Sequence, residues 1–173
     1  ADKLHPDSAL MILDAAEKEL GAPATASFKD FRNRYALIGT KASEISATWW
    51  INTDQKTVVA PKPGRVSLIE FTAHWCGPCK NEIPALIKAQ EALDGQLVVL
   101  GVDFLESSGP ATSILDSFGA TYPAVLDASG SVAEHYRTSG GVPVSFFIDK
   151  DGVLRATRRG ELYEKDLPGF LAQ

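Results

Sequence analysis

Hydrophobic positions near the start of the chain follow two different periods. Apolar residues recur at helical spacing over 9–20, where a break at Gly21-Ala22-Pro23 ends the pattern, and a second, shorter helix is predicted after Ser27. Apolar and polar residues then alternate over 45–51, and a polar turn leads into a second short run at 56–59. This pattern predicts a helical extension over residues 1–40, followed by an N-terminal β-hairpin.

Strand and helix patterns alternate in the rest of the chain. Residues 66–71 form an apolar run typical of a strand covered on both faces, 82–93 have helical spacing, and 96–103 form the next buried run. A strand, helix and strand in this order predict parallel strands joined by a right-handed crossover, and therefore an α/β fold. The remaining expected elements are a helix at 110–118, a strand at 122–126, a helical turn at 131–136, a hairpin at 144–157 and a closing helix at 163–171.

Composition and charge narrow the class of protein. With 173 residues, 45% of them hydrophobic, the chain is long enough for one compact domain, which we place at 41–173. The net charge of −5 gives no electrostatic footprint for nucleic acid, and the short basic cluster at 155–159 is interpreted as solvated surface. No apolar run approaches the ~20 residues that span a bilayer, so no membrane contact is expected. The chain starts with Ala1, which leaves open a signal peptide or anchor removed upstream.

The two cysteines of the chain, Cys76 and Cys79, form one C-x-x-C motif and therefore serve chemistry rather than a disulfide framework. The thiolate is the reactive form of cysteine, and a helix N-terminus favours it, so we expect Cys76 to attack and the more shielded Cys79 to close the disulfide. Pro78 fits the first helical turn, and Gly77 leaves room for the backbone of a partner.

A cysteine pair can also bind zinc or Cu(I), or belong to a peroxidase. A zinc site needs further ligands, but no second C-x-x-C follows and the histidines His5, His74 and His135 are scattered, so neither a metal nor a cofactor is predicted. A Cu(I) metallochaperone using the same thiols is an alternative, although the only methionine is Met11. A peroxidase is disfavoured because Thr72 stands four residues before Cys76 rather than three.

Two motifs in the chain resemble those of a known family. Residues 71–80, Phe-Thr-Ala-His-Trp-Cys-Gly-Pro-Cys-Lys, resemble the active-site segment of thioredoxin, and residues 141–143, Gly-Val-Pro, resemble its cis-proline loop. The wider pattern is similar to the extracytoplasmic TlpA/ResA-like branch, and it includes Glu-Ile-Pro at 82–84, Tyr-Pro at 122–123 and the run at 147–152. Over residues 40–173 the resemblance implies a thioredoxin-like fold, a central mixed β-sheet flanked by helices, and thiol-disulfide oxidoreductase activity.

The resemblance also implies a substrate groove, partners and a location. Pro143 would be cis and would face the disulfide, the backbone at Val142 would pair with the substrate chain, and Trp75 would flank the groove. The partners would be a protein dithiol or disulfide and an upstream redox donor. The protein would be a monomer outside the cytoplasm, with a cytoplasmic location as the alternative.

Two acidic residues depart from the usual family pattern by occurring together. Thioredoxin has a buried acid at the position of Glu70, and the ResA-like pattern places an acid at the position of Glu82. Burial should raise the pKa of Glu70 and make it a proton acceptor for Cys79, unless it pairs with a lysine such as Lys80. Glu82 lies three residues after Cys79, on the same helix face, where it would either tune this thiol or face solvent.

Two neighbouring residues and the direction of the reaction complete the prediction. His74 would stabilise the Cys76 thiolate or lie at the surface, with the surface favoured, and Pro84 should kink the helix. The predicted reaction is reduction of protein disulfides through a mixed disulfide, with disulfide donation by the same residues as the alternative, because sequence does not fix the direction.

Overall fold

The computed structural model describes residues 6–21, 29, 31–47, 49–53, 64–93, 95–105, 107–138 and 141–171. None of the helices in these ranges is long and apolar enough to cross a membrane.

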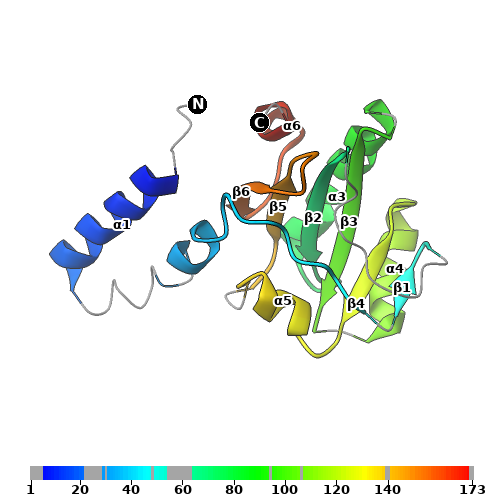
Figure 1. Cartoon of the computed structure of the whole chain (residues 1–173). Coiled ribbons are helices and arrows are strands. Elements are labelled where there is room, and N and C mark those ends of the chain that lie inside the picture. Colours follow the sequence, from blue (N-terminus) through cyan, green and yellow to red (C-terminus); the bar gives the residue numbers. More distant parts are fainter. Residues whose placement is uncertain are drawn as a thin grey trace.

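The centre of the molecule is a mixed six-stranded sheet (Figure 1). Its order is β1-β4-β3-β2-β5-β6; β2, β3 and β4 are mutually parallel, and β1, β5 and β6 run antiparallel to their neighbours. This arrangement confirms the predicted α/β fold. The strand bounds are β1 Trp50–Ile51, β2 Val66–Thr72, β3 Leu97–Phe104, β4 Ala124–Asp127, β5 Val144–Ile148 and β6 Leu154–Arg159.

The strand expected over 45–51 is reduced to two residues, which pair with β4. The partner expected at 56–59 lies outside the described residues.

Helices and loops cover the two faces of the sheet separately. On one face Leu68 and Val99 belong to a core cluster with Leu86 of α3 (Gly77–Ala92) and Leu115 of α4 (Ser108–Phe118). The other face forms a second cluster that includes Ile69, Phe71, Phe146, Ile45 and residues of α5 (Ser131–His135). The chain ends in the short helices η1 (Glu164–Asp166) and α6 (Leu167–Leu171), and Leu167 packs in the first cluster. Because both faces are covered, β2 and β3 are buried along almost their whole length.

The N-terminal helix α1 (Pro6–Leu20) forms as predicted and leaves part of its apolar face uncovered. Ile12 and Leu20 of the predicted apolar face are 57% and 63% exposed, because no described element covers that side of the helix. Arg32, in the helical turn at 31–35, holds α1 through ion pairs with Asp14 at 2.6 Å and Glu17 at 2.9 Å.

The predicted start of the second helix at Ser27 lies outside the described residues. Phe31, in the helical turn at 31–35, is 39% exposed.

Residues 39–47 form a strap that crosses one face of the sheet toward β1, drawn in cyan in Figure 1. It is fastened at β6, where the Gly39 amide donates to the Leu154 carbonyl at 2.7 Å, and the buried Ile45 anchors it in the second cluster. The domain boundary at residue 40 stays a prediction.

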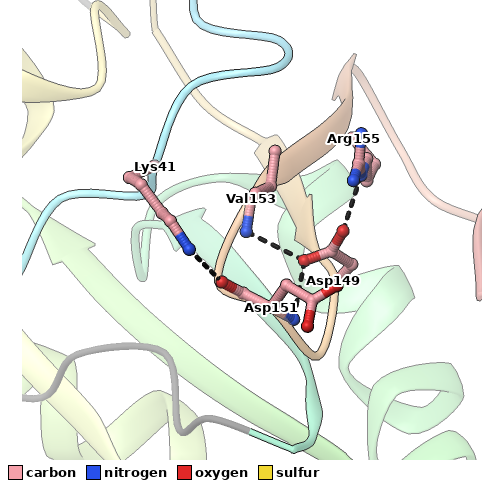
Figure 2. Close-up of polar contacts among 5 residues, drawn as sticks. All are labelled: Lys41, Asp149, Asp151, Val153 and Arg155. Atoms are coloured by element: carbon pink, nitrogen blue, oxygen red, sulfur yellow. Dashed lines mark hydrogen bonds and ion pairs between the residues drawn. The ribbon is translucent and has the colours of Figure 1, made fainter.

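The turn between β5 and β6 is closed by Asp149 (Figure 2). Its Oδ1 accepts from the amides of Asp151 and Val153, both at 2.9 Å, and its Oδ2 accepts from Arg155 Nε at 2.6 Å. Lys41 of the strap donates to the Asp151 carbonyl, so the turn and the strap hold each other.

Candidate redox site

Cys76 and Cys79 form a disulfide at the start of α3, with a Cα–Cα distance of 5.3 Å. Cys76 is the N-cap of the helix, and its Sγ accepts from the Cys79 amide at 3.2 Å. The backbone dipoles at this end therefore point toward Cys76, as predicted, and favour a negative charge on its sulfur. Cys76 is 5% exposed and Cys79 is fully buried, which makes Cys76 the sulfur that a partner can reach first. Pro84 lies inside α3, as expected.

The loop before β5 faces this disulfide. The Val142–Pro143 peptide bond is cis, which confirms the expectation for Pro143. Val142 packs against the small cluster formed by Ala73, Cys76 and Cys79. The structure therefore brings 141–143 beside the disulfide.

The other residues predicted for a substrate groove are solvent-facing around Cys76. Trp75 is 59% exposed, and Gly77 and Pro78 of the first helical turn are also exposed. A partner chain can therefore reach the side of the disulfide formed by these three residues.

Glu70 belongs to a row of side chains that crosses four strands on the face covered by α3. Register pairs it with Gly101 on β3 and Ser145 on β5, and Ser145 in turn pairs with Arg158 on β6. Residues paired in register point to the same face of a sheet, so these positions lie under α3 together. Neither carboxyl oxygen of Glu70, which is 2% exposed, has a hydrogen-bond partner in the described part of the chain.

The side chain of Glu82 points into the protein from α3, the helix that covers the sheet face carrying Glu70. It is 1% exposed, and its Oε2 accepts from the Leu162 amide at 2.9 Å, while its Oε1 has no partner among the described residues. Its alternative position facing solvent is therefore wrong. Glu82 follows Cys79 by one helical turn on α3, and its carboxyl group is close enough to that of Glu70 to change its pKa, so the two acids share one buried region under this helix.

Burial disfavours the charged form of both acids. It raises the pKa of Glu70 well above its usual range, and the nearby charge of Glu82 raises it further. Burial also raises the pKa of Glu82 to about 7, against the opposing effects of its interaction with the Glu70 side chain, its bond from the Leu162 amide and the positive charge of Arg158. The pair can therefore hold a proton near neutral pH, which a single exposed glutamate cannot do.

Sequence reasoning did not place three neighbours of this pair at the site. Tyr122 packs on Gly101, and its pKa is raised by burial and then by the charges of Glu70 and Glu82. Ser145 and Arg158 join the pair only through strand register. The one available signal was Ser145 itself, a polar residue in the middle of an apolar strand.

Several sequence candidates lie apart from this buried region. Lys80 is exposed and makes no ion pair with any described residue, so the suggested pairing with Glu70 is wrong. His74 and His135 are exposed, as predicted, and His5 lies outside the described residues. Within the described ranges, no three His, Cys, Asp or Glu side chains are grouped to hold a metal ion.

A family model described as the AhpC/TSA family matches residues 38–157, more than half of the chain. The chain therefore belongs to this family. The disulfide at the start of α3, the fold, and the likeness to thiol-disulfide oxidoreductases named ResA and DsbE define it as a thioredoxin-fold thiol-disulfide oxidoreductase of the ResA-like group, as predicted.

Individual relatives agree with this class. The chain is 30% identical to the thiol:disulfide interchange protein DsbE homolog of Paracoccus denitrificans, over 76% of this chain and 71% of that protein. It is 29% identical to the thiol-disulfide oxidoreductase ResA of Geobacillus kaustophilus, over 62% of each chain. The crystal structure of a DsbF homologue from Corynebacterium diphtheriae has the same fold, with a TM-score of 0.68, 24% identity, and coverage of 78% of this chain and 87% of that one.

Proposed function

We propose that this protein reduces disulfide bonds in other proteins through Cys76 and Cys79, with Glu70 and Glu82 managing the proton of Cys79. The observation that supports this best is that the two sulfur atoms lie in different surroundings. The reachable sulfur lies at a helix N-terminus, and the fully buried sulfur stands one helical turn before Glu82, which with Glu70 forms a buried carboxyl pair without a cationic partner in hydrogen-bond contact among the described residues.

The reaction starts from the reduced dithiol. The Cys76 thiolate attacks one sulfur of the substrate disulfide, forming a mixed disulfide and releasing the other substrate sulfur as a thiolate, which takes a proton. Cys79 transfers its proton to the carboxyl pair and attacks the Sγ of Cys76, which releases the second substrate thiol. The Cys76–Cys79 disulfide of the structure is then the oxidised product, and an upstream dithiol donor returns two electrons to it.

The substrate chain is proposed to lie across Trp75, Gly77 and Pro78 on one side and Val142 and Pro143 on the other. Trp75 supplies an exposed aromatic surface, and the cis Val142–Pro143 bond turns the backbone beside the disulfide. The backbone at Val142 would pair with the backbone of the substrate chain. Such pairing recognises an extended segment with little dependence on its sequence.

The proposed direction of electron flow rests on the carboxyl pair, whose effect on the couple opposes that of the helix N-terminus at Cys76. A couple becomes oxidising when its reduced, thiolate form is stabilised. Two buried carboxyl groups do the opposite, because a second negative charge in their neighbourhood is disfavoured. The pair therefore favours the disulfide form of this protein, which makes its dithiol a reductant.

Trapping of the mixed disulfide tests this function. Cys79→Ser should accumulate substrate linked to Cys76, whereas Cys76→Ser should trap nothing and lose turnover. Intact-mass analysis of each variant with a disulfide-containing protein substrate measures both. Full turnover of Cys76→Ser, or equal trapping by the two variants, would contradict the scheme.

We also propose that the protein works as a monomer outside the cytoplasm. Its likeness to ResA and to the DsbE homolog supports this location. A fusion of the complete gene's N-terminus to a reporter that is active only after export tests it.

A further inference from the structure

A surface hollow of about 360 Å³ lies next to the segment that carries the redox disulfide. Its walls include His74 and Lys80, which stand two residues before Cys76 and one residue after Cys79, and Gly109, Ser113 and Ser117 on one side of α4. A water molecule needs only ~30 Å³, so the hollow has room for an amino-acid side chain.

The side of the hollow formed by α4 carries small residues. A Cβ added at Gly109 would meet no atom within 4 Å, and Ser113 and Ser117 are exposed. These positions recur at helical spacing, so they present one continuous strip of α4 toward the start of α3. The hollow is therefore open to a chain that lies over the disulfide.

The charge of the residues that line the hollow comes from Lys80. Lys80 brings a positive charge that no described residue neutralises through an ion pair, although the whole chain carries a net charge of −5. None of the described residues that line the hollow is acidic; the hydroxyl groups of Ser113 and Ser117 add hydrogen-bonding capacity, and Pro110 and Ile114 add apolar surface. A carboxylate with a short apolar stem complements this combination of Lys80, hydroxyl groups and apolar surface better than a cation does.

We propose that this hollow is a specificity subsite that receives an Asp or Glu side chain of the substrate protein, close in sequence to the cysteine that Cys76 attacks. The inference rests on the proposed disulfide reduction and adds the substrate class to it. A segment paired with the loop at 141–143 passes over Cys76, and its next residues reach Lys80 on the far side of the helix start. The subsite therefore selects disulfides that have an acidic neighbour.

A peptide series tests the subsite. Each peptide carries one cysteine in a mixed disulfide with a chromophoric thiol, and a single Glu, Gln or Lys at one position from four before to four after it. The readout is the ratio of kcat/KM for the Glu and Gln peptides, compared between wild type and variants. This comparison removes any change in Cys76 reactivity, because such a change affects both peptides equally.

The wild type should prefer the Glu peptide at one or two positions by about threefold to tenfold, a preference that falls with rising salt. Lys80→Gln should bring the ratio to the value of the other positions, and Lys80→Glu should turn the preference toward the Lys peptide. Ser113→Trp should also abolish it by filling the hollow while keeping the charge. The control Lys88→Gln removes another exposed lysine of α3, which pairs with Glu164, and should leave the ratio unchanged.

Two results overturn the subsite. In one, the ratio is the same at every position in the wild type; in the other, Lys88→Gln changes the ratio as much as Lys80→Gln does. In either case the peptides would still be reduced through Cys76, so the proposed function would stand. Absence of any peptide reduction would instead contradict the function itself.

Discussion

At the scale of single residues, the buried carboxyl pair sets the chemistry of the site. Glu70 and Glu82 come from a strand and a helix, and neither makes a salt bridge within the described residues. A raised carboxyl pKa makes the stability of the fold depend on pH, because the unfolded chain loses its proton at a lower pH than the folded one. For Glu82, the contribution of the bound proton to the free energy of unfolding is fully present below the ordinary pKa of 4.5. This contribution is lost as the pH rises through the folded pKa of about 7.

Glu82→Gln tests this linkage. Titration of Glu82 should lower the free energy of unfolding of the oxidised wild type by as much as about 3 kcal/mol as the pH rises from acid to above neutral. Glu82→Gln should lose this share and keep the dependence that comes from Glu70, while its side-chain oxygen still accepts from the Leu162 amide. Denaturant titrations at several pH values measure it. Glu164→Gln, at an exposed position, is the control, and an identical pH dependence in wild type and Glu82→Gln would refute the linkage.

Gly101 makes room for Tyr122 beside this pair. An added Cβ would lie 3.0 Å from the Cβ of Ala124 and 3.3 Å from Cε2 of Tyr122, both closer than ordinary contact. Gly101→Ala should therefore destabilise the fold by about 1 to 3 kcal/mol, as overpacking does. Gly109→Ala, whose Cβ meets no atom within 4 Å, should cost nothing measurable. Chemical denaturation of both variants compares them, and equal stability would show that Tyr122 can shift freely.

At the scale of elements, the turn of the last hairpin shows how backbone groups fix a sheet edge. Burial opposes ionisation of Asp149, but bonds from the Val153 amide, Arg155 and the Asp151 amide outweigh it and hold the pKa of Asp149 below its usual value. A lowered carboxyl pKa stabilises the fold above the ordinary value, and this stability is lost as the pH falls through the folded one.

Asp149→Ala should cost about 1 to 3 kcal/mol at neutral pH, because two amides lose their acceptor. The difference from wild type should shrink in acid. Thermal unfolding at pH 7 and below pH 4 measures both effects. Asp151→Ala, which keeps its amide and carbonyl, is the matched control, and a difference that stays constant with pH would contradict the assigned role of the carboxylate.

Local patterns predicted the elements that depend on local physics. The run 66–71 became β2, and C-x-x-C became the start of α3, because a strand buried on both faces and a helix N-terminus each leave a short-range signature. Long-range pairing left no such signature. Trp50 and Ile51 found their partner in β4, 73 or more residues later, and the register that places Ser145 beside Glu70 exists only in the sheet.

In the candidate site, too, local features could be predicted from the sequence and long-range contacts could not. Helical spacing placed Glu82 on the face of Cys79, but the segment around Leu162 that covers it comes from the far end of the chain. For α1 the period identified an apolar side without showing that no described element covers it.

At the scale of the whole molecule, the strap rather than α1 joins the N-terminal region to the sheet. Ile45 is 1% exposed in the second cluster, whereas α1 is held through Arg32. Removing residues 1–21 should therefore leave the thermal midpoint and disulfide exchange close to those of the full chain. Ile45→Ala should cost about 2 to 5 kcal/mol, as large-to-small core changes do. If the deletion costs as much as Ile45→Ala, residues 1–40 are part of the domain.

The central claim is that the Cys76–Cys79 couple is a protein disulfide reductant, and its reduction potential tests this most directly. Equilibration with redox buffers of known ratio, read by mass after thiol alkylation, gives the value. The account predicts a potential near that of thioredoxin, about −270 mV, and a more oxidising value in a variant with both Glu70→Gln and Glu82→Gln. A potential near that of DsbA, about −120 mV, would contradict the account and assign the protein to disulfide donation.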